Sequence, residues 1–126
     1  MKLLLDSHVF LWWLAGDRKL RAGPRQAMAD PTSIVYVSAA TIWELSLKAA
    51  IGKLDLDGAD LVEEIAENDF VELPMTARHS LAAAYLPHHH EDPFDRMLIA
   101  QAQIEGLTIV TKDLAFRAYE VSILPA

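Results

Sequence analysis

The feature that most restricts the fold of this chain is a short apolar segment, residues 107–110, which follows a predicted helix and precedes an aspartate. The segment reads Leu-Thr-Ile-Val and is typical of a parallel strand that is buried on both faces. Gly106 comes directly before it, and Thr111, Lys112 and Asp113 follow. In open α/β sheets ligands gather outside the carboxyl ends of the strands, so Asp113 lies where functional groups are expected.

The helix before this strand has well-marked ends. Asp92 and Pro93 read as an N-cap followed by proline at the first helical position, which places Asp95 at the third position. There its negative charge faces the positive end of the helix dipole. Gly106 can end the helix in the left-handed conformation. The segment therefore predicts a helix over residues 93–105 that leads into the strand.

The rest of the chain alternates strands and helices in the same way. The expected strands are residues 2–5, 34–37, 70–73, 107–110 and about 121–124. The expected helices are residues 9–15, 24–29, 39–51, 61–68, 77–85 and 93–105. This order predicts an α/β fold with a mostly parallel sheet of four to five strands flanked by helices. With neither repeat nor linker visible in 126 residues, we expect a single domain over residues 1–126.

Composition restricts the partners and the compartment. The chain has no cysteine, which excludes disulfides and fits a reducing cytoplasm, and no apolar run approaches a membrane span. A formal net charge of −7 argues against binding nucleic acid through a broad basic surface, although bound cations can still meet phosphate. One basic cluster is a candidate substrate contact, with an ordinary solvated surface as the alternative. It comprises Arg18, Lys19, Arg21 and Arg25.

Four acidic residues are predicted to converge at one edge of the sheet. Asp6 ends the first strand, Glu44 lies in the helix after the second strand, Asp113 follows the fourth, and Asp95 opens the preceding helix. Clustered carboxylates repel one another unless cations bind, so convergence predicts a metal site. Carboxylate oxygens suit Mg²⁺ or Mn²⁺, and two such ions about 3.5–4 Å apart can clamp both oxygens of a phosphodiester displacement.

Each of these acids also has a structural interpretation. Asp6 can cap the first helix, and Glu44 can form an ion pair with Lys48 one turn away. For both residues we favour the functional role, because each carboxylate interrupts an apolar segment. The charge of Asp95 is equally explained by the helix dipole, and Asp113 can cap a following turn. For these two residues both interpretations stay open.

Hydroxyl and imidazole groups add further candidates. Ser7 and Thr111 each lie beside a candidate carboxylate, where a hydroxyl could orient a metal-bound water or a phosphate. The run His88-His89-His90 resembles a metal site, but three consecutive side chains do not easily face one ion. We therefore interpret the run as a polar loop.

Three segments, taken together, resemble the PIN-domain family, and specifically the VapC-type toxins of bacterial toxin–antitoxin pairs. They occur in the family's order and read LLLDSHVFLWWL, VSAATIWELSLK and DPFDRMLIAQAQIEGLTIVTKD. The resemblance implies a metal-dependent endoribonuclease with a Rossmann-like PIN fold that is a homodimer and is restrained by a cognate antitoxin. One departure is Glu91, where close relatives often carry arginine, and an acid there weakens the attraction for RNA phosphate.

The family's acidic positions fall on Asp6, Glu44, Asp95 and Asp113, and its hydroxyl positions fall on Ser7 and Thr111. The resulting hypothesis is that Asp6, Glu44 and Asp95 hold one Mg²⁺ or Mn²⁺, while Asp113 supports a second ion or the attacking water. Arg96 has two expected roles, a phosphate contact or a salt bridge to a neighbouring acid. An acidic site also suits an arginine-bearing antitoxin segment, for which the Trp-rich first helix offers apolar surface.

Other classes of protein fit less well. A phospho-receiver needs an acceptor aspartate after the third strand, where Leu73 and Pro74 stand. A phosphatase with an aspartyl nucleophile needs a second aspartate two residues after Asp6, where His8 stands. A catalytically inactive module that binds metal or a partner remains an alternative.

Overall fold

The computed structural model describes all residues from 1 to 126 and contains one parallel sheet. Its strands are β1 (Lys2–Leu5), β2 (Ile34–Ser38), β3 (Val71–Leu73), β4 (Thr108–Thr111) and β5 (Ser122–Pro125). The strand order is β3-β2-β1-β4-β5, and every neighbouring pair is parallel. Because all strands run in one direction, their carboxyl ends lie along a single edge. The predicted α/β fold with a mostly parallel sheet is confirmed.

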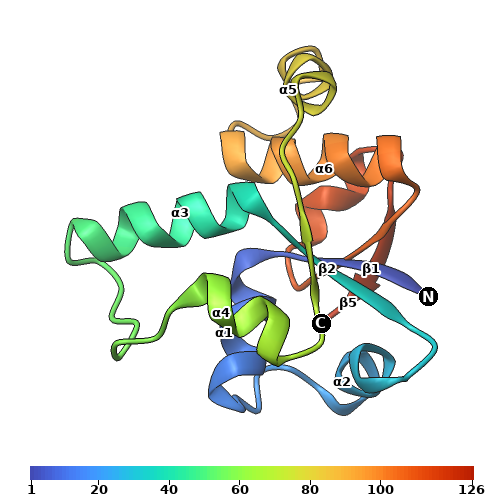
Figure 1. Ribbon diagram of the computed structural model, residues 1–126. Coiled ribbons are helices and arrows are strands. Elements are labelled where there is room, and N and C mark those ends of the chain that lie inside the picture. The colour runs from blue at the N-terminus through green and yellow to red at the C-terminus, as the bar shows by residue number, and fades with distance from the viewer.

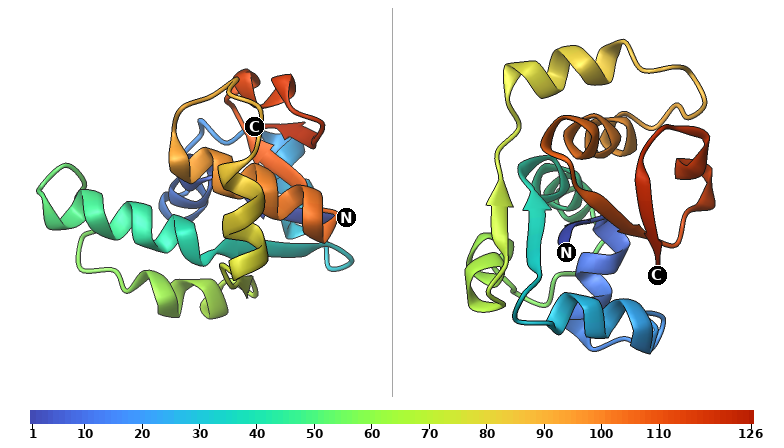
Figure 2. Two further views of the ribbon diagram at one scale, coloured as in Figure 1. Left: turned by 90° about the horizontal axis from the view of Figure 1, so that it is seen from above. Right: turned by 90° about the vertical axis from the view of Figure 1, so that its right-hand side faces the viewer.

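Helices cover both faces of this sheet. They are α1 (Ser7–Ala15), α2 (Ala22–Ala29), α3 (Ala39–Ala50), α4 (Leu61–Glu67), α5 (Ala77–Ala84) and α6 (Pro93–Glu105), with a 3-10 helix, η1 (Leu114–Ala118). Figure 1 and the right view of Figure 2 show α5 and α6 on one side of the sheet and α1 and α2 on the other. Helix α3 continues past the sheet edge, which is clearest from above in Figure 2. No helix combines the length and apolar character that crossing a membrane requires.

The central strands are apolar because they supply two hydrophobic cores at once. Successive side chains of a strand point to opposite faces of the sheet. Leu3 and Leu5 accordingly belong to the core beneath α1, α2 and α4, whereas Leu4 belongs to the core beneath α5 and α6. Leu4 pairs in register with Tyr36 of β2 and Ile109 of β4. The two cores hold β1 rigidly at the centre, and Asp6 follows its last residue.

The predicted ends of α6 are confirmed. Asp92 is the N-cap, accepting a hydrogen bond from Phe94 N–H at 2.8 Å, and Pro93 is the first helical residue. Gly106 ends the helix in the left-handed region with φ of 69°. The strand that follows begins at Thr108 and not at Leu107, because the Leu107 N–H still bonds to a helix carbonyl, Ala102 O.

Two helices, α1 and α2, start earlier in the chain than predicted. Helix α1 begins at Ser7, because Asp6 is its N-cap, and not at Val9. Helix α2 begins at Ala22 and not at Pro24, so the proline occupies its first turn. Proline is tolerated there, since the N–H groups of the first turn have no partner within the helix.

The first helix, predicted to offer apolar surface, has its large apolar side chains buried or half-buried. In α1, Trp12 is buried, and Trp13 packs on Phe70 with ring centroids 5.5 Å apart. Its indole N–H also donates to Asn68 Oδ1 at 3.0 Å. None of the well-exposed large apolar side chains lies on α1, whereas α3 and its C-cap carry three of them, spaced four residues apart. They are Trp43, Leu47 and Ile51, which are 56%, 43% and 66% exposed.

Candidate functional site

A cavity of about 400 Å³ opens at the carboxyl edge of the sheet and gathers the predicted acids. Its walls come from the start of α1, the middle of α3, the start of α6 and the segment after β4. The four acids that line it are Asp6, Glu44, Asp95 and Asp113. They come from four separate elements and meet because three of these elements follow parallel strands, while α6 packs against α3. The structure thus brings together all four acidic residues selected from the sequence.

Asp6 both caps a helix and faces this cavity. Its Oδ1 accepts a hydrogen bond from Val9 N–H at 2.9 Å, and its Oδ2 accepts one from the Thr111 hydroxyl at 2.5 Å. The residue is 5% exposed. Burial raises the pKa of Asp6 above 3.8, and the hydrogen bonds from Thr111 and Val9 oppose that rise. The structural and functional interpretations of Asp6 are therefore compatible, because its two oxygens have different partners.

Glu44 reaches the cavity from the second turn of α3. Its side chain is 7% exposed, and its Oε2 lies 2.9 Å from Lys48 Nζ. The predicted ion pair with Lys48 is present. The N-cap of α3 is Ser38, and the buried hydroxyl of Thr41 in the first turn has no hydrogen-bond partner. From sequence, Lys48 was expected only as an ion-pair partner of Glu44. In the structure it also lines the cavity and places a positive charge beside the acids.

Asp95 shows the electrostatic cost of bringing these acids together. Burial and then the charge of Asp92 raise its pKa from 3.8 to about 7. His90 opposes this rise, while Glu44 and Asp6 add to it. A carboxyl whose pKa is raised by burial and by other carboxylates gains from a nearby cation, since the cation favours the ionised form. The charge balance of the cavity therefore suits a bound metal ion.

Thr111 connects two of the acids. Its hydroxyl donates to Asp6, and its oxygen also accepts from Asp113 N–H at 2.9 Å. Asp113 Oδ1 in turn accepts from Ala115 N–H at 2.9 Å, which makes it the N-cap of η1. Asp113 therefore has the cap role, while its other oxygen, Oδ2, faces the cavity. The hydroxyl of Ser7, which is 6% exposed, lines the same space.

His90 is a site residue that the sequence analysis missed. Its Nε2 lies 3.1 Å from Asp95 Oδ2 and 3.5 Å from Asp113 Oδ2. Its Nδ1 accepts a hydrogen bond from Asp92 N–H at 3.2 Å, so the proton of the neutral ring is on Nε2. The ring also packs edge-on against Phe116 at 6.1 Å. All three histidines lie in the loop between α5 and α6, as predicted, but the polar-loop interpretation overlooked the contacts of His90 with Asp95 and Asp113.

Arg96 is buried and does not face the cavity. Its Nη2 donates to Ala83 O and Leu86 O, both at 2.9 Å, and its Nη1 donates to Pro87 O at 2.9 Å. Neither expected role, a phosphate contact or a salt bridge to an acid, is met in the structure. The guanidinium instead satisfies backbone carbonyls at the end of α5. It thereby anchors the loop that carries His90, whose carbonyl oxygen it also contacts at 3.3 Å.

The basic cluster of Arg18, Lys19, Arg21 and Arg25 lies away from the cavity. Asp6 caps the first turn of α1, whereas the cluster follows the other end of that helix, and none of the four residues lines the cavity. The Arg25 guanidinium donates to Asp17 O and Leu20 O, a structural role. The two basic side chains that do line the cavity are Lys48 and Lys112, and Lys112 Nζ also lies 5.1 Å from the centroid of the Trp12 ring.

The donor set fits a hard divalent cation. Ligand atoms of His90, Asp95 and Asp113 lie within 4.8 Å of one another, and Asp6 and Glu44 line the same cavity. Carboxylate oxygens are the groups that Mg²⁺ and Mn²⁺ prefer, and Mn²⁺ also accepts an imidazole nitrogen more readily than Mg²⁺ does. The residues present therefore match the chemistry of the predicted ion.

Comparison with known proteins places this arrangement in a family. The model of the PIN domain matches residues 3–121. The chain is 31% identical over 120 residues to Ribonuclease VapC22 of Mycobacterium tuberculosis, covering 93% of this chain and 91% of that protein. Its fold resembles VapBC2 from Rickettsia felis bound to a promoter DNA fragment, with a TM-score of 0.77, 13% identity and coverage of 100% and 99% of the two chains. It also resembles DNA-bound VapBC from Salmonella typhimurium, with a TM-score of 0.73, 17% identity and coverage of 99% and 98%. The chain belongs to the PIN-domain family.

Proposed function

We propose that residues 1–126 form one PIN domain that acts as a metal-dependent endoribonuclease, the toxin of a toxin–antitoxin pair in the cytoplasm. The observation that carries this proposal is the meeting of Asp6, Glu44, Asp95 and Asp113 in one cavity. The raised pKa of Asp95 supports a cation as the partner of these acids. The similarity to a protein named Ribonuclease VapC22 supports RNA as the substrate.

The four carboxylates would hold Mg²⁺ or Mn²⁺. Asp6, Glu44 and Asp95 would hold one ion, and Asp113 would support a second ion or the attacking water. When bound, such an ion lowers the pKa of a coordinated water and stabilises negative charge on a phosphodiester. The residues of the chain contribute orientation. Thr111 fixes one oxygen of Asp6, and His90 Nε2 lies 3.1 Å from Asp95 Oδ2. The Ser7 hydroxyl lies where it can donate to a phosphate oxygen.

The test is cleavage of total cellular RNA by the purified protein with Mg²⁺, with Mn²⁺ and with chelator. We expect cleavage with either metal and none with chelator. Asp6→Asn should abolish cleavage and keep the fold, since an amide oxygen can still accept from Val9 N–H. Asp57→Asn is the matched control, because Asp57 is an exposed acid in the loop after α3 and lies outside the cavity. Cleavage retained by Asp6→Asn would reject the assignment.

Metal binding can be measured apart from activity. A ligand that binds only the folded state at 100 times its dissociation constant adds about 2.7 kcal/mol to the free energy of unfolding. We expect Mn²⁺ or Mg²⁺ to raise the melting temperature of the wild type and to raise that of Asp6→Asn much less. An equal rise in both proteins would place the ion elsewhere.

The proposed partners are a cognate antitoxin and a second copy of the chain. The structural neighbours named VapBC are complexes, which supports an antitoxin, and an acidic cavity attracts an arginine side chain. The exposed stripe on α3 offers apolar surface for one of these partners. Light scattering should give twice the 14.0 kDa chain mass for the free toxin, and adding the antitoxin should suppress cleavage.

A further inference from the structure

A second cavity adjoins the carboxylate site. It has a volume of about 230 Å³ and lies between α1, α3 and the segment that follows α3. The two cavities share three lining residues, Ser7, His8 and Lys48. We call this second space the α1–α3 cleft. The shared wall makes the cleft the direct continuation of the carboxylate site along α3.

The charge in the cleft is opposite to that in the carboxylate site. The chain carries a formal net charge of −7, yet the cleft is lined by two lysines and by no acid. Lys48 stands at the shared wall, and Lys53 lies farther out. The apolar part of the lining is Leu11 from α1, Leu45 from α3 and Leu54 from the segment after α3. Cations beside an apolar wall match an RNA strand, which presents phosphates and base faces together.

The position of Lys53 is set by the end of α3. The Lys53 N–H donates to Lys48 O at 2.9 Å, and the Gly52 N–H donates to Ala49 O at 3.1 Å. Gly52 has φ of 76°, in the left-handed region. These bonds form the Schellman motif, in which a glycine turns the chain back on the last helical turn. The motif holds the backbone of Lys53 against that of Lys48, so both lysines belong to the same cleft wall.

The exposed imidazole of His8 provides an aromatic surface at the junction of the two cavities. Its ring centroid lies 6.3 Å from that of Trp12, and the two ring planes are tilted by 50°. Stacking of a base on an aromatic side chain is tolerant of sequence and contributes about 1–3 kcal/mol. The junction thus offers one stacking surface between the acids and the lysines.

We propose that single-stranded RNA leaves the carboxylate site through the α1–α3 cleft, where Lys48 and Lys53 contact phosphates beside the cleaved one. The proposal rests on the ribonuclease function proposed above and adds the course of the substrate. Lys48 has two partners in this scheme, Glu44 in the free protein and a phosphate in the complex. Lys53 touches no acid of the site and reports on the cleft alone.

The test measures RNA binding in the Asp6→Asn protein with Mg²⁺, so that RNA is bound and not cut. The probe is a fluorescent single-stranded RNA oligonucleotide, and its affinity is measured at several salt concentrations. Each phosphate contact to a single strand contributes about 0.7 to the slope of log K against log salt. We expect Lys53→Ala to reduce this slope by about 0.7 and to weaken binding several-fold, while Lys53→Arg retains both values.

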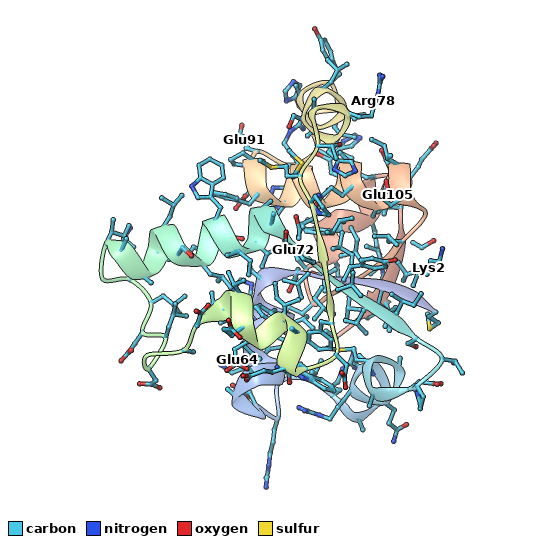
Figure 3. The ribbon with its side chains drawn as sticks, viewed as in Figure 1. Lys2, Glu64, Glu72, Arg78, Glu91 and Glu105 are labelled. Atoms are coloured by element: carbon cyan, nitrogen blue, oxygen red, sulfur yellow. The ribbon has the colours of Figure 1, made fainter.

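Lys2→Ala is the matched control. Lys2 is an exposed lysine at the start of β1, the opposite edge of the sheet from the acids, and Figure 3 shows it far from α3. Its substitution should leave the slope unchanged. In the protein with Asp6 intact, Lys53→Ala should raise KM for RNA cleavage, because the contact is made in substrate and transition state alike.

The outcomes separate this proposal from the function on which it rests. If the wild type cleaves RNA and Lys53→Ala leaves the salt slope unchanged, the cleft is not the path and the ribonuclease stands. If the wild type neither cuts nor binds RNA, both proposals are overturned. If Lys53→Ala weakens binding of an acidic peptide and not of RNA, the cleft belongs to a protein partner and the RNA path is rejected.

Discussion

The hydroxyl of Thr111 donates a hydrogen bond to Oδ2 of Asp6, joining residues 105 positions apart in the chain. The contact exists because β4 lies beside β1 in the sheet, with Val110 in register with Leu5. Thr111 is fully buried, so its hydroxyl has no water to bond instead. One side chain thus links the carboxylate at the end of β1 to the backbone of Asp113.

Thr111→Val keeps the shape of the side chain and removes the hydroxyl. The buried Asp6 Oδ2 loses its donor, which costs about 1–3 kcal/mol, and the Asp113 N–H loses its acceptor. Because the Thr111 bond lowers the pKa of Asp6, its loss should raise that pKa further. We expect the pH midpoint of Mn²⁺ binding to move upward, measured by calorimetry across pH 5–8. Thr108→Val, at the start of the same strand, is the control, and equal midpoints in both variants would contradict the role of Thr111.

Asp95 should make the metal-free protein less stable as pH rises. Its pKa is about 7 in the folded protein against 3.8 as the ordinary value, so the folded state holds this proton more tightly than the unfolded state. The stability that Asp95 contributes is fully present below pH 3.8 and is lost as pH rises through about 7. Urea unfolding in chelator from pH 4 to pH 8 should show this loss. Asp95→Asn should make the free energy of unfolding depend less on pH, and Asp57→Asn should leave that dependence unchanged.

Metal binding should show the reverse dependence on pH. Protonated Asp95 cannot serve as a ligand, so the apparent affinity should fall below pH 7 by up to about tenfold per unit. Calorimetric titration with Mn²⁺ at pH 6 and pH 8 measures the difference. An affinity that is equal at the two pH values would show that Asp95 does not ligate the ion.

His90→Ala should move the pH midpoint of Mn²⁺ binding upward. His90 opposes the rise in the pKa of Asp95, and its Nε2 lies 3.1 Å from the Asp95 carboxylate. Without the imidazole the acid holds its proton to a higher pH, so metal binds only in more alkaline solution. His88→Ala provides the comparison, because His88 is exposed and lies in the same loop outside the cavity. Identical Mn²⁺ titrations for the two variants would remove His90 from the site.

Arg96→Met should destabilise the fold, although Arg96 does not line the cavity. The substitution leaves buried carbonyls of Ala83 and Leu86 without their donors, and bonds to a charged group contribute about 1.5–3 kcal/mol each. We expect a loss of at least about 3 kcal/mol in urea unfolding.

Arg78→Met is the matched arginine control for that experiment. Arg78 is exposed on α5, and its side chain extends outward in Figure 3. Arg78→Met should change the free energy of unfolding by no more than about 0.5 kcal/mol. Similar losses for the two variants would mean that the carbonyl contacts of Arg96 contribute little.

The order of elements could be predicted from sequence because each one has a local signature. The run of three leucines in β1, the cap at Asp92 and the glycine at residue 106 depend only on neighbours in the chain. The meeting of the acids also followed from sequence, since parallel strands place residues such as Asp6 and Asp113 at one edge.

What only the tertiary structure decided is which side chains fill the space between those elements. The predicted basic cluster near Arg18 lies at the far end of α1, while Lys48 and His90 enter the carboxylate site. Arg96 stands one residue after Asp95, yet it turns into the core because the end of α5 presents unpaired carbonyls there. Sequence spacing fixes direction along one helix, whereas these contacts depend on how separate helices pack, and that information is not local.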